Sequence, residues 1–370
     1  MVNKMIDPEL LILPKKDPNP IAKVQEIAYL KLSVRDLSKS ISFYSDFGLR
    51  VVHTSKTEAT FSSYKRNSPC LFLQSGNKDQ LIGLGFFIDS NIEFSKLQES
   101  LNGELLFDSE FFKTHPILKL RDPSGLPIDI ILSDEWKEQE VNNYSHKVIK
   151  KTERQNIGFA SKIEKPKVLR LGHAVLQRVE YIKNMKWYCH YLGLIPSDTQ
   201  VLKKSKAPVL SFLRCDRGNL YTDHHTLVLA QGLSDKLEHY AFELESLDSV
   251  GKAKEYIKSK GWNSAWGIGR HLLGSQIFDY LRDPSGLLVE HYCDGDRFDS
   301  SIPMGIHSIS RKGLYIWGED HPKDFLDLNI SLSKLIDVLL SLWKRKQFSL
   351  KLIFELKSNL DEPARDWLRR

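Results

Sequence analysis

The chain has 370 residues, of which 41% are hydrophobic and 27% are charged, and its formal net charge is +6. This length is too great for one average hydrophobic core, so we expect a globular protein with two domains. The basic residues are scattered among acidic ones and are not interleaved with aromatic residues, which argues against nucleic acid as a partner.

Three further features bear on the compartment in which the protein works. The four cysteines lie far apart and form no CxxC pair, which argues against a zinc knuckle and fits a reducing compartment. The first twenty residues carry acids and prolines, so no signal peptide is expected. The apolar segment 332–343 is interrupted by Lys334 and Asp337 and is too short to cross a bilayer. We therefore expect a cytoplasmic protein with no membrane partner.

After a proline-rich lead-in, the apolar pattern predicts a strand, a helix and then several strands. The first helix is expected to begin near Asp36 and to end before Gly48. The strands are expected at 27–34, 49–53, 60–64, 70–73 and 81–88, the helices at 40–47 and 93–101, and a final pair of strands within 118–131.

The polar residues 136–166 are typical of a linker. The same order of elements then returns. The strands are expected at 168–177, 210–214, 226–230 and 239–244, the helices at 181–191 and 249–260, and a closing hairpin at 277–292.

This order is an internal repeat. The heptapeptide Leu-Arg-Asp-Pro-Ser-Gly-Leu occurs at 120–126 and again, unchanged, at 281–287. Identity over seven residues, in register with a repeated order of elements, is improbable by chance. The sequence therefore predicts a duplicated module of a strand, a helix and further strands.

The two copies differ where metal-binding residue types stand. The differences are His173 against Tyr29, His239 against Gly83 or Leu84, and Glu290 against Asp129. Two histidines and one carboxylate leave open coordination positions that suit Fe(II), and they also tolerate Mn²⁺, Zn²⁺ or Ni²⁺. Asp129 and His115 have no histidine partners in the first copy, so we expect a remnant or surface residues there.

Each of these residues also has a structural explanation when taken alone. A histidine on an apolar strand, such as His173, is more often a hydrogen-bonded core residue than a ligand. Tyr280 could pack against a neighbouring strand. Glu290 is harder to dismiss, because an unpaired buried carboxylate is costly. His291 follows Glu290 directly and should face the other side of the strand.

The spacing of these residues resembles that of the type I extradiol ring-cleaving catechol dioxygenases of the vicinal oxygen chelate superfamily. The family's metal ligands fit His173, His239 and Glu290. Its His-His-Thr segment fits His225, which lies 14 positions before His239, and its Gly-Arg-His, Tyr and Glu series fits His271, Tyr280 and Glu290 at intervals of 9 and 10. The resemblance covers about residues 26–320.

The resemblance implies an α+β fold. It consists of two tandem vicinal-oxygen-chelate domains, each made of paired βαβββ modules forming an incomplete barrel, plus a C-terminal helical extension. The implied boundaries are a lead-in at 1–25, a degenerate domain without metal at 26–135, a linker at 136–166, a catalytic domain at 167–297 and the extension at 298–370.

The implied activity is extradiol cleavage of a catechol-type aromatic by O₂ at a non-haem Fe(II) centre, which gives a ring-opened semialdehyde or keto acid in the catabolism of aromatic compounds. The metal triad would hold Fe(II), and Mn(II) accepts the same ligands. His225 would be the acid and base, Tyr280 would hydrogen-bond the ionised substrate oxygen, and His271 would hold the substrate. His224 stays a candidate beside His225, since the sequence leaves open which of the two faces the metal. The implied partners are the aromatic diol, O₂ and further copies of the chain.

Two other enzymes of this fold remain alternatives: a glyoxalase-type isomerase or lyase, and a 4-hydroxyphenylpyruvate dioxygenase-like enzyme. Neither explains why His225, His271 and Tyr280 occur together. Metal-free binding proteins use the fold as well, but the retained triad argues against that class. The tail 331–370 is longer than the family core requires, and its first part is expected to form an amphipathic helix.

Overall fold

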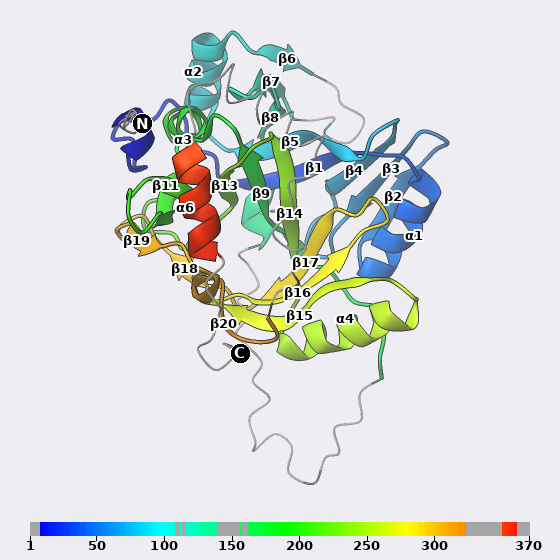
Figure 1. The fold of residues 1–370 in the computed structure, drawn as a ribbon. Helices are drawn as coiled ribbons and strands as arrows, with labels where there is room; N and C mark the ends of the chain where they lie inside the picture. Colours follow the sequence, from blue (N-terminus) through cyan, green and yellow to red (C-terminus); the bar gives the residue numbers. More distant parts are fainter. Residues whose placement is uncertain are drawn as a thin grey trace.

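The computed structural model describes residues 8–107, 112, 115–139, 156, 162–320, 322 and 350–360. The described strands form an eight-stranded sheet, a ten-stranded sheet and a two-stranded ribbon (Figure 1). We call the part of the chain in the first large sheet, residues 26–132, the N-terminal half, and the part in the second, residues 170–317, the C-terminal half.

The N-terminal half contains two βαβββ modules. The first comprises β1 (Glu26–Val34), α1 (Leu37–Phe47), β2 (Arg50–Thr54), β3 (Glu58–Ser62) and β4 (Pro69–Ser75). The second comprises β5 (Gln80–Ile88), α2 (Asn91–Leu101), β6 (Glu104–Leu106), β7 (Ile117–Arg121) and β8 (Pro127–Leu132). The sheet order is β2-β3-β4-β1-β5-β8-β7-β6, with β1 and β5 antiparallel at the centre.

The C-terminal half repeats this plan. Its first module comprises β9 (Arg170–Arg178), α3 (Tyr181–Tyr191), β10 (Ile195–Val201), β11 (Pro208–Arg214), β12 (Thr222–Asp223) and β13 (Leu227–Gln231). Its second comprises β14 (Lys236–Glu243), α4 (Leu247–Ser259), β15 (Ser264–His271), β16 (Ile277–Arg282) and β17 (Leu288–Cys293). The order is β19-β10-β11-β13-β9-β14-β17-β16-β15-β20, so β19 (Gly305–Ser308) and β20 (Tyr315–Trp317) extend the two edges. A short ribbon pairs β12 with β18 (Arg297–Phe298).

The predicted α+β fold of duplicated modules is confirmed, and neither large sheet closes on itself among the described strands, as expected for an incomplete barrel. The prediction missed β6, β10, β15, β19 and β20, which lie toward the sheet edges, and the two strands of the ribbon, β12 and β18. The segment of β10 contains Pro196, Ser197 and Asp198 and lacks an alternating pattern, so its pairing depends on its neighbours in the sheet. The amphipathic helix expected in the first part of the tail, residues 332–346, lies outside the described residues, and the domain boundaries stay a prediction.

The start and end of α1 agree with its predicted capping residues. The carboxylate of Asp36 accepts a hydrogen bond from the backbone N–H of Lys39 at 2.9 Å, which satisfies one of the free donors of the first turn. Gly48 ends the helix with a φ of 110°, a conformation that residues with a side chain rarely adopt. The helix buries Phe43, Tyr44 and Phe47.

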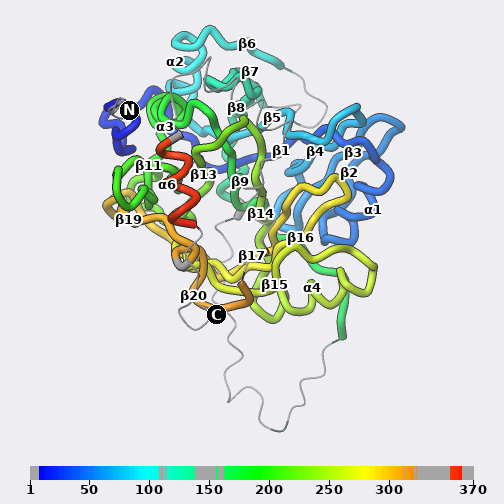
Figure 2. Tube along the Cα trace, viewed as in Figure 1, coloured from blue at the N-terminus to red at the C-terminus, as the bar shows by residue number. Residues whose placement is uncertain are grey.

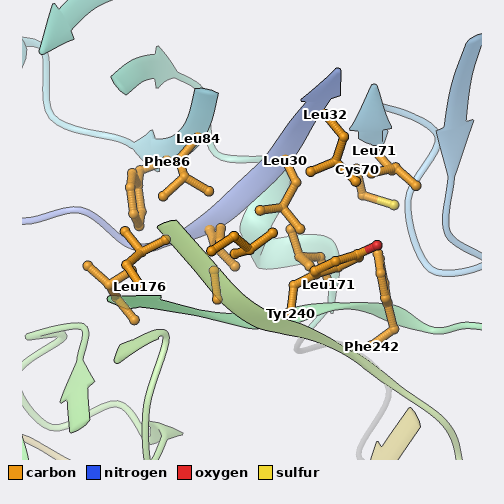
Figure 3. Packing of buried hydrophobic residues seen from close by; sticks show 14 of the residues in the cluster. Leu30, Leu32, Cys70, Leu71, Leu84, Phe86, Leu171, Leu176, Tyr240 and Phe242 are labelled. Atoms are coloured by element: carbon orange, nitrogen blue, oxygen red, sulfur yellow. The ribbon is translucent and has the colours of Figure 1, made fainter. Parts of the chain in front are cut away.

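One hydrophobic core joins the two halves. Leu30 and Leu84 from the N-terminal half belong to the same buried cluster as Leu171 and Tyr240 from the C-terminal half (Figure 3). All four side chains are fully buried. The central strands of the two sheets therefore pack against each other, which fixes the halves as one body.

The repeated Asp-Pro-Ser-Gly turns link the halves in both directions. In each turn one carboxylate oxygen accepts two backbone N–H groups, at 2.9 Å, from Ser124 and Leu126 or from Ser285 and Leu287. The other oxygen reaches the opposite half: that of Asp122 accepts from Tyr188 at 3.0 Å, and that of Asp283 accepts from Tyr44 at 2.6 Å. The heptapeptide is thus both a turn and a reciprocal contact between the halves.

The ends of the described chain pack on the C-terminal half. The segment after η1 (Pro8–Leu11) runs beside α3, where Asp17 lies 2.8 Å from Nδ1 of His190 (Figure 2). The helix α6 (Leu350–Leu360), red in Figure 1, shares an apolar cluster with Val209 of β11. None of the helices in the described ranges has the length and apolar character needed to cross a membrane.

Candidate metal centre and substrate cavity

Three neighbouring strands at the centre of the second sheet carry the predicted metal ligands. His173 on β9 and Glu290 on β17 both pair with Ala241 on β14, and His239 stands two residues before Ala241. Because residues two apart on a strand share a face, all three side chains project to the same side of the sheet. Each of the three residues lies in a largely apolar segment, and such segments form the buried central strands of the sheet.

The three side chains converge on one point. Nε2 of His173 and Nε2 of His239 lie 3.5 Å and 3.6 Å from Oε2 of Glu290, and one ligand atom from each residue falls within 4.8 Å of the others. Ligands about 2.0–2.2 Å from a shared ion lie roughly 3–3.5 Å apart, so the set is close to metal-binding geometry.

The surroundings of Glu290 also fit a cation. Its side chain is fully buried, and neither carboxylate oxygen accepts a hydrogen bond within ordinary limits of distance and angle from a described residue. A buried carboxylate without donors is costly unless a cation compensates it. Two imidazoles and one carboxylate form the donor set of Fe(II) and Mn(II) sites with open coordination positions.

Burial sets the protonation of these groups. Removal from water lowers the pKa of His173 and of His239 to about 3 and raises the pKa of Glu290 above its usual range. Both imidazoles are therefore neutral near pH 7, which leaves a nitrogen lone pair on each for a metal. A bound divalent cation would favour the ionised form of the carboxyl.

His225 lies beside the three candidate ligands, at the end of a row of hydrogen-bonded side chains. Its ring centroid lies 4.2 Å from that of His173, and its Nδ1 lies 2.9 Å from Nδ1 of His224. Nε2 of His224 donates to Asp198 at 2.6 Å, and the other oxygen of Asp198 lies 2.7 Å from Nε2 of the half-exposed His307. Of the two adjacent histidines, His225 lines the cavity, whereas His224 lies behind it and orients it.

Tyr280 and His271 form a second pair at the site. Nδ1 of His271 lies 2.7 Å from the carbonyl oxygen of Leu314, which can only accept, so that nitrogen carries the proton. Nε2 of His271 is then an acceptor, 2.9 Å from the Tyr280 hydroxyl. Burial, followed by the charge of Glu290, raises the pKa of Tyr280 well above its usual range, so the hydroxyl keeps its proton.

All these groups face one cavity. It holds about 1260 Å³ of space between atoms, part of it open to solvent, and His173, His225, His239, His271 and Tyr280 all line it. The structure thus brings together the predicted site residues, and Oε2 of Glu290 lies 3.5 Å and 3.6 Å from the two candidate ligand histidines.

Sequence reasoning missed several residues that shape this site. Asp198 lies on the unpredicted β10, and Trp266, on the unpredicted β15, stacks on Tyr280 with a ring separation of 5.7 Å. Leu356 and Leu360 of α6 line the cavity from the far end of the sequence. No short motif marks any of them, because their roles arise only when distant segments meet.

The N-terminal half carries no such site among its described residues. Tyr29 and Asp129 both pair with Gly85, and Lys31 pairs with Gly83, so Gly83 rather than Leu84 is the counterpart of His239. Asp129 was expected to be a remnant or a surface residue; it is only 6% exposed, which rules out the surface. His291 lies on the opposite face from Glu290, where its ring stacks on Phe47 of α1 at 3.8 Å.

Comparison with known proteins gives a consistent picture. Residues 170–291 match the sequence model of the Glyoxalase/Bleomycin resistance protein/Dioxygenase superfamily. Metapyrocatechase 2 of Cupriavidus necator is 24% identical over 311 residues, covering 83% of this chain and 93% of that protein. The iron-dependent extradiol dioxygenase of Rhodococcus jostii (strain RHA1) is 21% identical over 322 residues, covering 80% and 97%.

Solved structures share the fold. The Mn(II)-bound glyoxalase from Novosphingobium aromaticivorans superposes with a TM-score of 0.64 at 19% identity, covering 82% of this chain and 94% of that one. An extradiol ring-cleaving dioxygenase from B. fuscum superposes with a TM-score of 0.66 at 17% identity, covering 85% and 84%. The chain therefore spans nearly the whole length of relatives that are extradiol dioxygenases.

Proposed function

We propose that this chain, whose residues 170–291 form a domain of the glyoxalase/bleomycin resistance protein/dioxygenase superfamily, is an extradiol dioxygenase that cleaves the ring of a catechol-type aromatic with O₂. The observation that carries the proposal is the meeting of the buried His173, His239 and Glu290 with His225, His271 and Tyr280 in one cavity. A site for metal alone would not need the second set of residues.

Iron is the metal we propose for the triad. When bound, Fe(II) would supply Lewis acidity toward the diol and one-electron chemistry toward O₂. His173 and His239 would provide neutral nitrogen ligands, and Glu290 would provide the carboxylate. The preference for Fe(II) over Mn(II), assembly as a homo-oligomer and a cytoplasmic location are parts of the same proposal.

The remaining residues handle protons and orient the substrate. His225 is neutral, because burial lowers its pKa well below the usual range, so its Nε2 can take a proton from a substrate hydroxyl. His224 occupies Nδ1 of His225, which leaves Nε2 as the ring nitrogen that can meet a substrate. The Tyr280 proton, held by Nε2 of His271, can turn to an ionised substrate oxygen. Trp266 packs beside Tyr280 and excludes water from that side.

An anaerobic reconstitution tests the proposal. The purified protein is loaded with Fe(II), mixed with unsubstituted catechol and exposed to air. We expect a yellow ring-opened product with one O₂ consumed for each catechol. Loading with Zn²⁺ or Ni²⁺ serves as the control, since neither metal supplies the redox step. The proposal is wrong if a broad panel of catechols gives no product while the protein isomerises glyoxalase-type substrates.

A further inference from the structure

The helix α6 docks on the C-terminal half through specific contacts. Oε1 of Glu355 accepts the backbone N–H groups of Lys204 and Ser205 at 2.7 Å and 3.0 Å, and Oδ1 of Asn359 accepts the backbone N–H of Lys203 at 3.1 Å. These three donors belong to the turn between β10 and β11. Leu352, one turn before Leu356, is fully buried beneath the helix.

This docking directs the apolar face of α6 into the substrate cavity. Leu356 and Leu360 line the cavity together with Val209 and Ile309, and all four belong to one apolar cluster. The exposed face of the same helix carries Phe354, which is 68% exposed. The helix is therefore oriented, with one face forming a wall and the other facing solvent.

The register of the strands places this wall away from the metal triad. On β9, the cavity is lined by His173, Val175 and Gln177 in turn. Four residues of strand span roughly 13 Å, so Gln177 lies well beyond the triad. Ala230 pairs with both Gln177 and Leu210, and Leu210 stands beside Val209, against which α6 packs. The cavity thus runs from the triad at one end to α6 at the other.

The charge of the cavity restricts what can lie in it. None of the described residues that line the cavity is a lysine or an arginine. Besides the histidines and Tyr280, the ionisable residue in this lining is Glu238. The Glu238 carboxylate lies 3.0 Å from Nε2 of Gln177 and 3.0 Å from Nζ of Lys236, which compensates its charge. A carboxylate on a bound substrate would leave water with no lysine or arginine among the described lining residues to pair with it.

We propose that α6 is the specificity wall of the site, and that the substrate class is a catechol bearing an uncharged apolar alkyl or aryl substituent, directed along the cavity toward Leu356 and Leu360. This inference rests on the proposed function and narrows it. Carboxylated catechols are rejected by the same cavity. The relevant residues belong to the C-terminal extension, beyond the duplicated modules.

Binding without turnover measures this preference directly. The Fe(II)-loaded protein is titrated calorimetrically under strictly anaerobic conditions with catechol, 4-propylcatechol and 3,4-dihydroxyphenylacetate. Each buried methylene contributes about a fourfold gain in affinity, so we expect 4-propylcatechol to bind at least about tenfold more tightly than catechol. We expect 3,4-dihydroxyphenylacetate to bind at least about tenfold more weakly than catechol, since its carboxylate loses water without gaining a cation.

Variants on the two faces of α6 assign the effect to the helix. Leu356→Ala should reduce the affinity for 4-propylcatechol about three- to tenfold more than that for catechol. Leu356→Arg should reverse the order of the propyl and carboxylated ligands. Phe354→Ala and Phe354→Arg make the same changes on the exposed face and should leave the order unchanged. If Leu356→Arg fails to fold, the comparison of Leu356→Ala with Phe354→Ala still shows whether the inner face of α6 sets the ligand preference.

The outcomes separate this inference from the proposed function. If catechol is cleaved but the propyl and carboxylated ligands bind equally, the inference is wrong and the activity stands. Equal effects of Leu356→Ala and Phe354→Ala would likewise overturn the role of α6. If neither catechol nor any substituted catechol binds or is cleaved, the proposed function fails and the inference falls with it.

Discussion

The hydroxyl of Tyr29 lies 2.5 Å from Oδ2 of Asp129, at the two register positions that His173 and Glu290 occupy in the other half of the molecule. Nζ of Lys31 lies 2.8 Å from the same oxygen. A hydroxyl and an ammonium therefore compensate the carboxylate in the N-terminal half. In the C-terminal half no described ammonium group pairs with Glu290; Nε2 of His173 and Nε2 of His239 lie 3.5 Å and 3.6 Å from its carboxylate instead, an arrangement that suits a metal.

Replacing each of the two carboxylates by its amide should separate the structural role of Asp129 from the proposed metal-binding role of Glu290. Asp129→Asn weakens an internal charge-assisted bond, so we expect the free energy of unfolding to fall by about 1–3 kcal/mol with unchanged metal content. Glu290→Gln keeps the shape of the side chain but removes its charge, and we expect most of the bound metal to be lost. Metal analysis and urea unfolding on both variants check this. Wild-type iron occupancy in Glu290→Gln would show that Glu290 is not a ligand.

The removal of the His225 imidazole should affect turnover without affecting metal binding. Nε2 of His225 is the proposed proton acceptor, and general acid and base groups typically contribute about 10²–10⁴ in rate. We therefore expect His225→Ala to lower kcat by this range while iron content stays at the wild-type level. His53→Ala, on an exposed edge of the N-terminal half, is the control and should leave kcat unchanged. Wild-type kcat in His225→Ala would remove His225 from the mechanism.

Much of the fold could be predicted from the sequence because short local signals specify it. The capping residue Asp36 and the terminating Gly48 define α1, and the repeated heptapeptide identifies the second module by identity alone. The strands β10 and β15 escaped prediction for a physical reason. The residues of β10 lack alternation and those of β15 include Gly267 and Gly269, which weaken a strand signal, so both strands depend on pairing with β11 and β16.

The residues of the site likewise divide into those that the sequence predicts and those that it does not. The difference between the two copies and the resemblance in spacing were enough to propose His173, His239 and Glu290, and three strands of fixed register hold these residues. Asp198 could not be proposed, since its link to His224 depends on how β10 lies against the loop before β13. Leu356 could not be proposed either, because the contact of α6 with the cavity joins segments about 150 residues apart.

Neutralisation of Asp198 should impair His225 at a distance. The Asp198 carboxylate accepts Nε2–H of His224 at 2.6 Å and so fixes the ring that contacts Nδ1 of His225. Loss of about 1–2 kcal/mol from this charge-assisted bond predicts a fall in kcat of about 5- to 30-fold for Asp198→Asn.

In this variant KM and iron content should stay near their wild-type values, because Asp198 touches neither substrate nor metal. His307→Ala removes the exposed partner of the same carboxylate and should lower kcat less than threefold, a rough bound set by the small energies of exposed ion pairs. Steady-state kinetics with catechol distinguish the two. An equal loss in both variants, or a change confined to KM, would argue against a positioning role for Asp198.

Asp279 should make the fold less stable as pH rises. Its side chain is fully buried on β16, and no described residue donates to either carboxylate oxygen within ordinary hydrogen-bond limits; Nζ of Lys254 lies 3.7 Å away. Burial raises the pKa of Asp279 to about 7, whereas an exposed aspartate titrates near 3.9. Between about pH 4 and pH 7 the folded chain thus holds a proton that the unfolded chain has released, and stability falls across this range as the pH rises.

Asp279→Asn removes this titration, so its stability relative to the wild type should increase from pH 5 to pH 8. A pKa difference of about 3 corresponds to at most about 4 kcal/mol over the full range, of which roughly half to two thirds falls between these two pH values. Urea unfolding at both pH values measures the difference. The control Asp248→Asn changes a half-exposed carboxylate on α4 and should shift stability by less than about 0.5 kcal/mol at either pH. A pH-independent effect of Asp279→Asn would show that this carboxyl is ionised throughout the range, held in that state by the neighbouring Lys254.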